Sequence, residues 1–295
     1  SRSMKSNTKK TLKFFLKHLL HYRLLFALMC FAQIAGQVTD MIVPLYYKDI
    51  FDIFAISGGD KTALTGQLMG TIRMIVLLFA LDFVFWRFTD FANGYFLTKT
   101  SKNISEEAFE YLSHHSYRFF SNRFTGSLVR KIYRLGGGFE MFYSKFFWDF
   151  LPLTTRVITM VVILWQFSPL ISGIILAWTL VFIVLSVFLA RWQYPLDLAA
   201  YKADSDVSAF LSDVITNHLN MKLFTAHRYE LSRLQTINSS WLEKNLRSWN
   251  MSATINLFQS IFMFILEVGI LLVLIMLWKE DAISPGFFIV VQIYI

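Results

Sequence analysis

Long apolar segments dominate the hydrophobic pattern of this 295-residue chain. Five of them are about 20 residues or longer, which is enough for a helix to cross a hydrocarbon core of ~30 Å. They cover approximately residues 24–45, 71–97, 146–167, 170–190 and 251–278, and a sixth apolar stretch fills 286–295. The pattern predicts an all-α polytopic membrane protein with six transmembrane helices, the sixth of them incomplete at Ile295.

Two long polar links separate these spans, at residues 98–150 and 191–250. Glu, Asp, Lys and Ser recur there at helical spacing, and Pro and Gly are rare apart from Gly136 to Gly138. We therefore expect spans two to five to continue as long helical extensions on one side of the membrane. The link between spans three and four is minimal, since only Ser168 and Pro169 stand between them.

The distribution of Lys and Arg predicts on which side of the membrane the helical extensions lie. Residues 1–23, 98–150 and 191–250 together contain 22 of these cations, whereas the links on the other side contain 3. Loops rich in Lys and Arg stay in the cytoplasm. We therefore expect a multi-pass protein of the cell membrane, with a cytoplasmic N-terminus and cytoplasmic helical extensions.

Composition argues against other classes of protein. The chain is 55% hydrophobic and 16% charged, with a mean hydropathy of +0.49, which does not fit a soluble domain. Its net charge of +8 follows from the membrane orientation, so no nucleic-acid partner is expected. Cys30 is the single cysteine and lies in the first span, and neither an internal disulfide nor a metal site is predicted.

The segment before the first span, residues 1–23, has an amphipathic pattern. One helical stripe is basic and the opposite stripe is apolar; the first contains Lys10, Lys13, Lys17 and His21, and the second Leu12, Phe15, Leu16 and Leu19. Such a helix lies in the membrane interface with its cations at the lipid headgroups. The alternative is a disordered basic tail. We therefore divide the chain into a cytoplasmic basic tail with an amphipathic interfacial helix, residues 1–23, and a transmembrane domain, residues 24–295.

Among the charged residues that fall within the spans, four are candidates for the transport path or for an intramembrane pair. Asp82, Arg156 and Glu267 are placed near mid-membrane, and Asp40 is nearer the outer face. A lone charge there costs ~2.5–3.5 kcal/mol, so each should pair or face a water-filled cavity. A static pair of Arg156 with Asp82 or Glu267 and a role in lining the substrate path are both open.

The two long links contain motifs that resemble the intracellular loops of ABC exporter membrane domains. The first match runs from the aromatic pair Phe119-Phe120 through Gly126 to the basic-aliphatic ending at Ile132. The second runs from Asp213 to Phe224, and the third is Ile283-Ser-Pro-Gly286 followed by Tyr294, which is similar to the start of the sixth span in that family. The matches occur in the family's order and cover nearly the whole chain.

This resemblance implies an exporter that moves an amphipathic substrate, such as a lipid, drug or peptide, by alternating access. It also implies coupling to an ATPase domain outside this chain, through Phe119, Phe120, Arg123, Gly126, Asp213, Leu219, Lys222 and Phe224. ATP and Mg²⁺ would bind that nucleotide-binding domain, so no cofactor and no catalytic residue is expected here. A second half-transporter, identical or different, would complete the dimer.

Two departures from the family pattern lie in the second motif, where Asn217 replaces the usual Gly and Asp213 the usual Glu. They fit one half of an asymmetric heterodimer. Residues 58–62 do not form a phosphate-binding loop, because Asp60 stands where a glycine must precede the lysine. The alternatives from other classes are a carrier or channel that does not use ATP, and a membrane scaffold that binds partners without transport.

Overall fold

The computed structural model describes residues 2–55, 61–121 and 125–295, and every regular element within these ranges is helical. The chain divides into two compact units. The first unit comprises Ser1–Pro169 and Leu277–Ile295, and the second comprises Leu170–Met276. The prediction of an all-α fold is confirmed.

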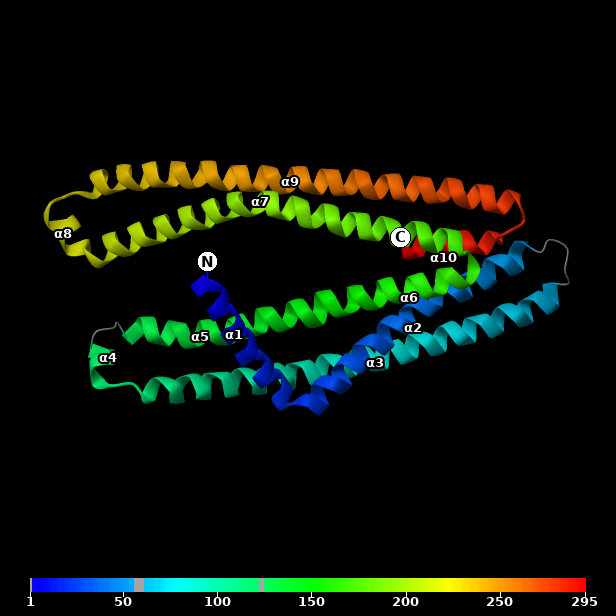
Figure 1. Ribbon diagram of the computed structural model, residues 1–295, viewed down its shortest axis with the longest axis horizontal. Coiled ribbons are helices and arrows are strands. Elements are labelled where there is room, and N and C mark those ends of the chain that lie inside the picture. The colour runs from blue at the N-terminus through cyan, green and yellow to red at the C-terminus, as the bar shows by residue number, and fades with distance from the viewer. Residues whose placement is uncertain (1, 56–60, 122–124) are drawn as a thin grey trace. The chain divides into compact units, whose positions relative to one another are not determined.

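The first unit contains the N-terminal helices and the C-terminal one (Figure 1). Its elements are α1 (Arg2–His21), α2 (Arg23–Ala55), α3 (Lys61–Ser113), α4 (Tyr117–Ser121), α5 (Thr125–Ser144), the π-helical turn η1 (Lys145–Phe150), α6 (Leu151–Phe167) and α10 (Pro285–Tyr294). The second unit is a hairpin of α7 (Pro169–Thr216) and α9 (His227–Lys279), with the short helix α8 (His218–Leu223) at its turn.

The apolar windows lie in these helices as the sequence predicts. Within the described residues, five helices are long and apolar enough to cross a membrane, and α10 carries the sixth apolar stretch. The predicted extensions are also helical, since α3 continues to Ser113, α7 continues to Thr216 and α9 begins at His227. At about 1.5 Å per residue, helices of 48 and 53 residues are far longer than a bilayer is thick.

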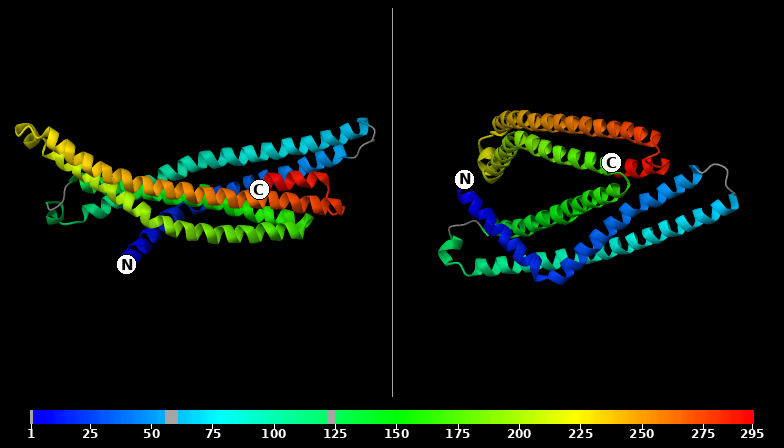
Figure 2. Two further views of the ribbon diagram at one scale, coloured as in Figure 1. Left: turned by 90° about the horizontal axis from the view of Figure 1, so that it is seen from above. Right: turned by 45° about the vertical axis from the view of Figure 1, so that its right-hand side comes forward.

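Helices α2 and α3 run side by side in every view of the first unit (Figures 1 and 2). Gly36 of α2 permits this close approach, because a Cβ atom there would lie 3.3 Å from Asp82 Oδ1 and 3.6 Å from Phe85 Cβ, both on α3. Small residues at such contacts are typical of helix packing in membranes. Helices α6 and α10 also pack against α2, which makes α2 the centre of the unit.

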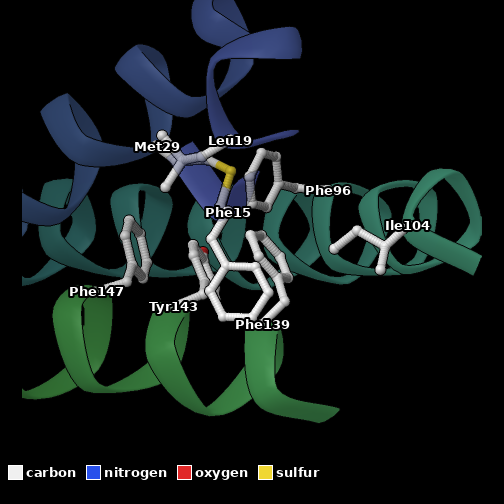
Figure 3. Close-up of a cluster of buried hydrophobic side chains, with 8 residues drawn as sticks. All are labelled: Phe15, Leu19, Met29, Phe96, Ile104, Phe139, Tyr143 and Phe147. Carbon is white, nitrogen blue, oxygen red and sulfur yellow. The ribbon is translucent and has the colours of Figure 1, made fainter. Parts of the chain in front are cut away.

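A cluster of large apolar side chains joins α1 to the rest of the first unit (Figure 3). Phe139, Tyr143 and Phe147 stack at helical spacing, with ring centroids 6.2 and 5.3 Å apart. The Tyr143 hydroxyl donates to Asn93 Oδ1 of α3 at 2.7 Å, which satisfies its polar end. Phe15 packs on the Phe139 ring at 5.7 Å. Burial of each such side chain contributes roughly 1.5–3 kcal/mol, so the cluster fixes α1 on the unit.

The N-terminal segment is helical over Arg2–His21. The four apolar side chains of its predicted stripe have two different surroundings. Phe15 and Leu19 are buried in the protein, whereas Leu12 and Leu16 on the same predicted stripe are 41% and 42% exposed. The stripe divides because α1 rests on protein along one edge and leaves the adjacent edge uncovered.

Polar side chains hold the two long helices of the second unit together. Gln193 Nε2 of α7 donates to Ser252 Oγ of α9 at 2.6 Å, and Ser248 Oγ donates to Asp197 Oδ1 at 2.5 Å. Further along the hairpin, the Trp178 and Phe262 rings stack with centroids 4.1 Å apart. Interhelical hydrogen bonds of this kind stabilise helix pairs where the hydrophobic effect is weak.

Candidate coupling tips and intramembrane polar cluster

The first tip is α4, the short helix between α3 and α5. Its Phe119 ring packs at a tilt against His115 of the turn after α3, with ring centroids 4.2 Å apart, whereas Phe120 is 39% exposed. Gly126 lies in the first turn of α5, and Arg123 lies outside the described residues. The two predicted aromatic anchors therefore differ, because Phe119 packs partly within the unit and Phe120 faces outward.

The second tip is α8, and its apolar side chains are open. Leu219 and Phe224 are 62% and 78% exposed, and Leu223, which the motif did not single out, is 69% exposed. Lys222 is also exposed. Adjacent apolar side chains on one short helix are costly to leave in water, so this surface fits a contact with another protein.

Local hydrogen bonds determine how the second tip turns. Asn217 Nδ2 donates to the carbonyl and to the carboxylate of Asp213, both at 3.0 Å. Asn217 has φ −96°, a conformation that does not require glycine, so its replacement of the usual Gly leaves the turn intact. After α8, Thr225 has φ 50°, and the Ala226 amide donates to the Met221 carbonyl at 3.0 Å. This reversal returns the chain into α9.

Arg156 of α6 lies beside α2. Its Nε donates to Gln37 Oε1 at 2.7 Å, and its Nη2 lies 3.6 Å from Asp40 Oδ2. Gln37 and Asp40 are three residues apart on α2 and therefore share a face. The structure thus corrects the suggested pair of Arg156 with Asp82, because Arg156 of α6 faces α2 and takes its partners there.

Asp82 occupies a different position, on the side of α3 that packs against Gly36. Its Oδ1 atom is buried and accepts no hydrogen bond from the groups that the structure describes. Tyr294 of α10 reaches the same part of α2, where its hydroxyl donates to the Met41 carbonyl, next to Asp40. The charged groups of this region therefore come from α2, α3 and α6, with α10 beside them.

Glu267 lies in the second unit, on α9. Glu267 lines a shallow groove of about 430 Å³ along one side of α9. The other lining residues are the polar Asn256, Gln259 and Ser260 and the apolar Met263 and Phe264. These positions recur every three or four residues and so form one face of an otherwise apolar helix. Gln259 also donates to Ser186 Oγ of α7 at 3.1 Å.

Asp52 is a site residue that the sequence analysis missed. It lies near the end of α2 and accepts hydrogen bonds from the Ser284 hydroxyl and the Gly286 amide, both at 2.8 Å. Lys48 one turn earlier donates to the same carboxylate at 2.9 Å. The only signal in the sequence is an acid and a lysine four residues apart after an apolar window, which does not indicate the partner on α10.

Comparisons with known proteins agree with this architecture. The chain is 22% identical over 230 residues to the "Iron-sulfur clusters transporter ATM1, mitochondrial" of Debaryomyces hansenii, a match that covers 76% of this chain and 32% of that protein. It is 24% identical over 180 residues to the human "Iron-sulfur clusters transporter ABCB7, mitochondrial", covering 59% of this chain and 23% of that protein. The chain therefore spans about a third or less of the length of these relatives.

A solved structure and a family model extend the comparison to most of the chain. The structure of a bacterial Atm1-family ABC exporter with ATP bound superposes with a TM-score of 0.72 at 20% identity, covering 92% of this chain and 48% of that one. The fold is thus that of an ABC exporter membrane domain. The family model described as "ABC transporter transmembrane region" matches residues 26–295. The chain belongs to the ABC transporter transmembrane region family.

Proposed function

We propose that this chain is the membrane-spanning part of an exporter that uses ATP hydrolysis in a separate nucleotide-binding domain to move an amphipathic substrate. The observation that carries the proposal is α8, a short helix with exposed Leu219, Leu223 and Phe224 at the turn of a hairpin much longer than a membrane is thick. An apolar surface at that position can receive force from a partner domain and pass it along α7 and α9 into the spans.

The partners follow from the family. A nucleotide-binding domain would contact the two tips, and ATP and Mg²⁺ would bind there, away from the helices described above. A second half-transporter, identical or different, would complete the translocation path. We place the N-terminus and both tips in the cytoplasm, because 22 Lys and Arg residues lie on that side in the predicted topology and 3 on the other.

The substrate class follows from the polar groups that lie within apolar helices. Arg156, Asp40 and Gln37 in the first unit, and the Glu267 stripe in the second, give polar contact points among apolar side chains. In each unit, polar groups among apolar side chains suit contact with a molecule that has both apolar and charged parts. The similarity to iron–sulfur cluster transporters adds such a cluster to the substrates that should be tested.

Transport by the full-length protein in inside-out vesicles tests the proposal. Uptake of an amphipathic substrate should require ATP, and Leu219→Asp should abolish uptake while the protein still inserts, because a carboxylate on α8 disrupts an apolar contact. Leu246→Asp is the matched control, since Leu246 is 51% exposed on α9 but remote from α8 in sequence. Uptake that is independent of ATP would indicate a carrier or channel, and the absence of any uptake would indicate a scaffold.

A further inference from the structure

Helix α1 crosses α3 and α5 in the first unit (Figure 1). Residues of these three helices line a groove of about 700 Å³. This volume falls within the range of small-molecule sites. Helix α1 contributes Lys10 and Phe14, α3 contributes Tyr111, the turn after α3 contributes His115, and α5 contributes Leu128 and Lys131. None of these groups belongs to the intramembrane polar cluster or to α8, so the groove is a separate feature of the molecule.

The walls of the groove are apolar and ordered by helical spacing. On one side, the His115 ring lies between Tyr111 and Phe119, with centroids 4.9 and 4.2 Å away, and His115 Nδ1 is 2.9 Å from the Tyr111 carbonyl. On the other side, Leu128, Ile132 and Leu135 of α5 repeat every three or four residues. An apolar chain laid between these walls would contact rings on one side and aliphatic groups on the other.

The charges at the groove are unbalanced. Lys10 and Lys131 line it, and neither ammonium group has a hydrogen bond or ion pair with a residue that the structure describes. The one acid of the lining, Glu107, is already neutralised, because both its oxygens accept from Lys17 Nζ at 2.8 Å and one lies 3.1 Å from His18 Nε2. The groove therefore presents two uncompensated cations beside an apolar surface.

We propose that this groove binds a single-chain amphipathic anion, such as a long-chain fatty carboxylate. The apolar chain lies between the α3 and α5 walls, and the carboxylate accepts charge-assisted hydrogen bonds from the lysines. The chain's own N-terminus is a poor occupant, because the residues before Lys9 include Arg2 and Lys5 and no acid. Binding in the groove does not depend on the proposed transport function.

The position of the groove along α3 favours a single-chain molecule over a bilayer phospholipid. Residues 107–113 of α3 lie at least ten residues beyond the apolar window that ends at 97, which is ~15 Å of helix. A double-chain phospholipid would have to leave the bilayer to fill the site, whereas a fatty carboxylate exchanges through water. Phe119 of α4 is part of the lining, so an occupant would also contact the first tip.

Photolabelling of the full-length protein in nanodiscs of uncharged phosphatidylcholine tests the proposal. The probe is a palmitate that carries a diazirine in mid-chain, and the labelled peptides are mapped by mass spectrometry. Label is expected on 111–119 and on 128–135. The double variant Lys10→Gln/Lys131→Gln should lower this labelling about tenfold, the effect of losing roughly one charge-assisted hydrogen bond. The control Lys9→Gln/Arg130→Gln removes two neighbouring exposed cations outside the lining and should not change it.

Two further arms separate the alternatives. The corresponding alcohol and quaternary ammonium probes have the same chain without the anion, and equal labelling by all three would overturn the proposal, as would label confined to the apolar windows. Unchanged labelling of Lys10→Gln/Lys131→Gln would also overturn it. If phosphatidylglycerol in the nanodisc displaces the palmitate probe completely at low mole fraction, the occupant is a membrane phospholipid and the single-chain assignment is wrong.

Discussion

The Asp52 carboxylate accepts a hydrogen bond from the Gly286 amide, 234 residues later in the chain, and so caps α10 from outside that helix. Ser284 at the N-terminus of α10 makes no capping bond with its own side chain and instead donates to Asp52. A carboxylate near the first turn also interacts favourably with the helix dipole. Helix α10 is therefore fixed to the end of α2 by groups at its first turn.

The fit around Gly286 predicts that an added methyl group is not tolerated. A Cβ atom there would lie 2.3 Å from the Lys48 carbonyl oxygen and 2.7 Å from Asp52 Oδ1, and backbone cannot move aside as a side chain can. We expect Gly286→Ala to destabilise the full-length protein by about 1–3 kcal/mol in thermal unfolding, as in an overpacked core. The control is Gly269→Ala, where a Cβ meets nothing within 4 Å; a similar loss in both variants would contradict the prediction.

Removal of the Asp52 carboxylate should also weaken the contact between α10 and the end of α2, because hydrogen bonds are lost. Asp52→Ala leaves the Gly286 amide and the Lys48 ammonium without their acceptor, with an expected loss of about 1–3 kcal/mol in thermal unfolding. Asp52→Asn keeps an amide oxygen for Gly286 and should lose less. Asp49→Ala, an exposed acid near Lys48, is the control. Equal stability of Asp52→Ala and Asp49→Ala would show that the bonds at α10 contribute nothing.

The pairing of Arg156 with α2 predicts which substitutions interact. A double-mutant cycle of Arg156→Met with Asp40→Asn should give a coupling free energy of about 0.5–3 kcal/mol in thermal unfolding, because each single change removes the other's partner. The same cycle with Asp82→Asn should give coupling near zero, since Asp82 packs against Gly36 instead. Coupling of Arg156 to Asp82 and not to Asp40 would contradict the ion pair between Arg156 of α6 and Asp40 of α2.

A substrate role for Arg156 has its own signature. If this arginine contacts substrate, Arg156→Lys should preserve much of the stability but change which substrates stimulate ATP hydrolysis by the full-length protein, because the planar guanidinium binds anions differently from an ammonium. A stability effect with an unchanged substrate profile would assign Arg156 to structure alone.

The spans could be predicted from the sequence because run length and hydropathy do not depend on packing. Each window of about 20 apolar residues falls in a helix, and the polar continuation of α3 to Ser113 is visible from spacing alone. The partner of Arg156 could not be predicted in this way. It depends on which face of α6 meets α2, and a rotation of one residue, about 100° of helix, would exchange Asp40 for another neighbour.

The tips show a similar division. The motif located α8 and its exposed Leu219 and Phe224, because apolar residues at a polar turn stand out in the sequence. The motif did not show which of Phe119 and Phe120 is exposed. Adjacent residues point in different directions on a helix, and only the contact of Phe119 with His115 shows that Phe119 is the one that turns inward. Asp52 was missed because its partner is 234 residues away.

Cysteine labelling tests the topology that the charge distribution predicts. On a Cys30→Ser background, Asn217→Cys should react with an impermeant maleimide only after the membrane is permeabilised, and Lys279→Cys should react in sealed cells. Both positions are exposed in the structure, so accessibility does not limit the reaction. Reaction of Asn217→Cys in sealed cells would reverse the orientation and would place α8 where no nucleotide-binding domain could reach it.

The docking of α1 should depend on pH through His18. This side chain is 5% exposed, and burial lowers its pKa below the ordinary value, an effect that Glu107 opposes and that Lys17 and His21 reinforce. With a lower pKa in the folded state, the undocked helix binds more protons, so docking is strongest above about pH 6.5 and weakens as the pH falls below it. Protection factors for amide hydrogen exchange of residues 10–20, corrected for the slower intrinsic exchange at low pH, should therefore be smaller at pH 5.5 than at pH 7.5 in the full-length protein.

Two variants separate His18 from other titrating groups. His18→Gln removes the protonation and should leave the protection factors of α1 nearly independent of pH over this range, because glutamine does not titrate. His21→Gln is the matched control, since His21 is exposed on the same helix and should retain the wild-type pH response. If the protection factors of wild-type α1 are equal at both pH values, or if His21→Gln alone removes the response, then His18 does not control the docking of α1.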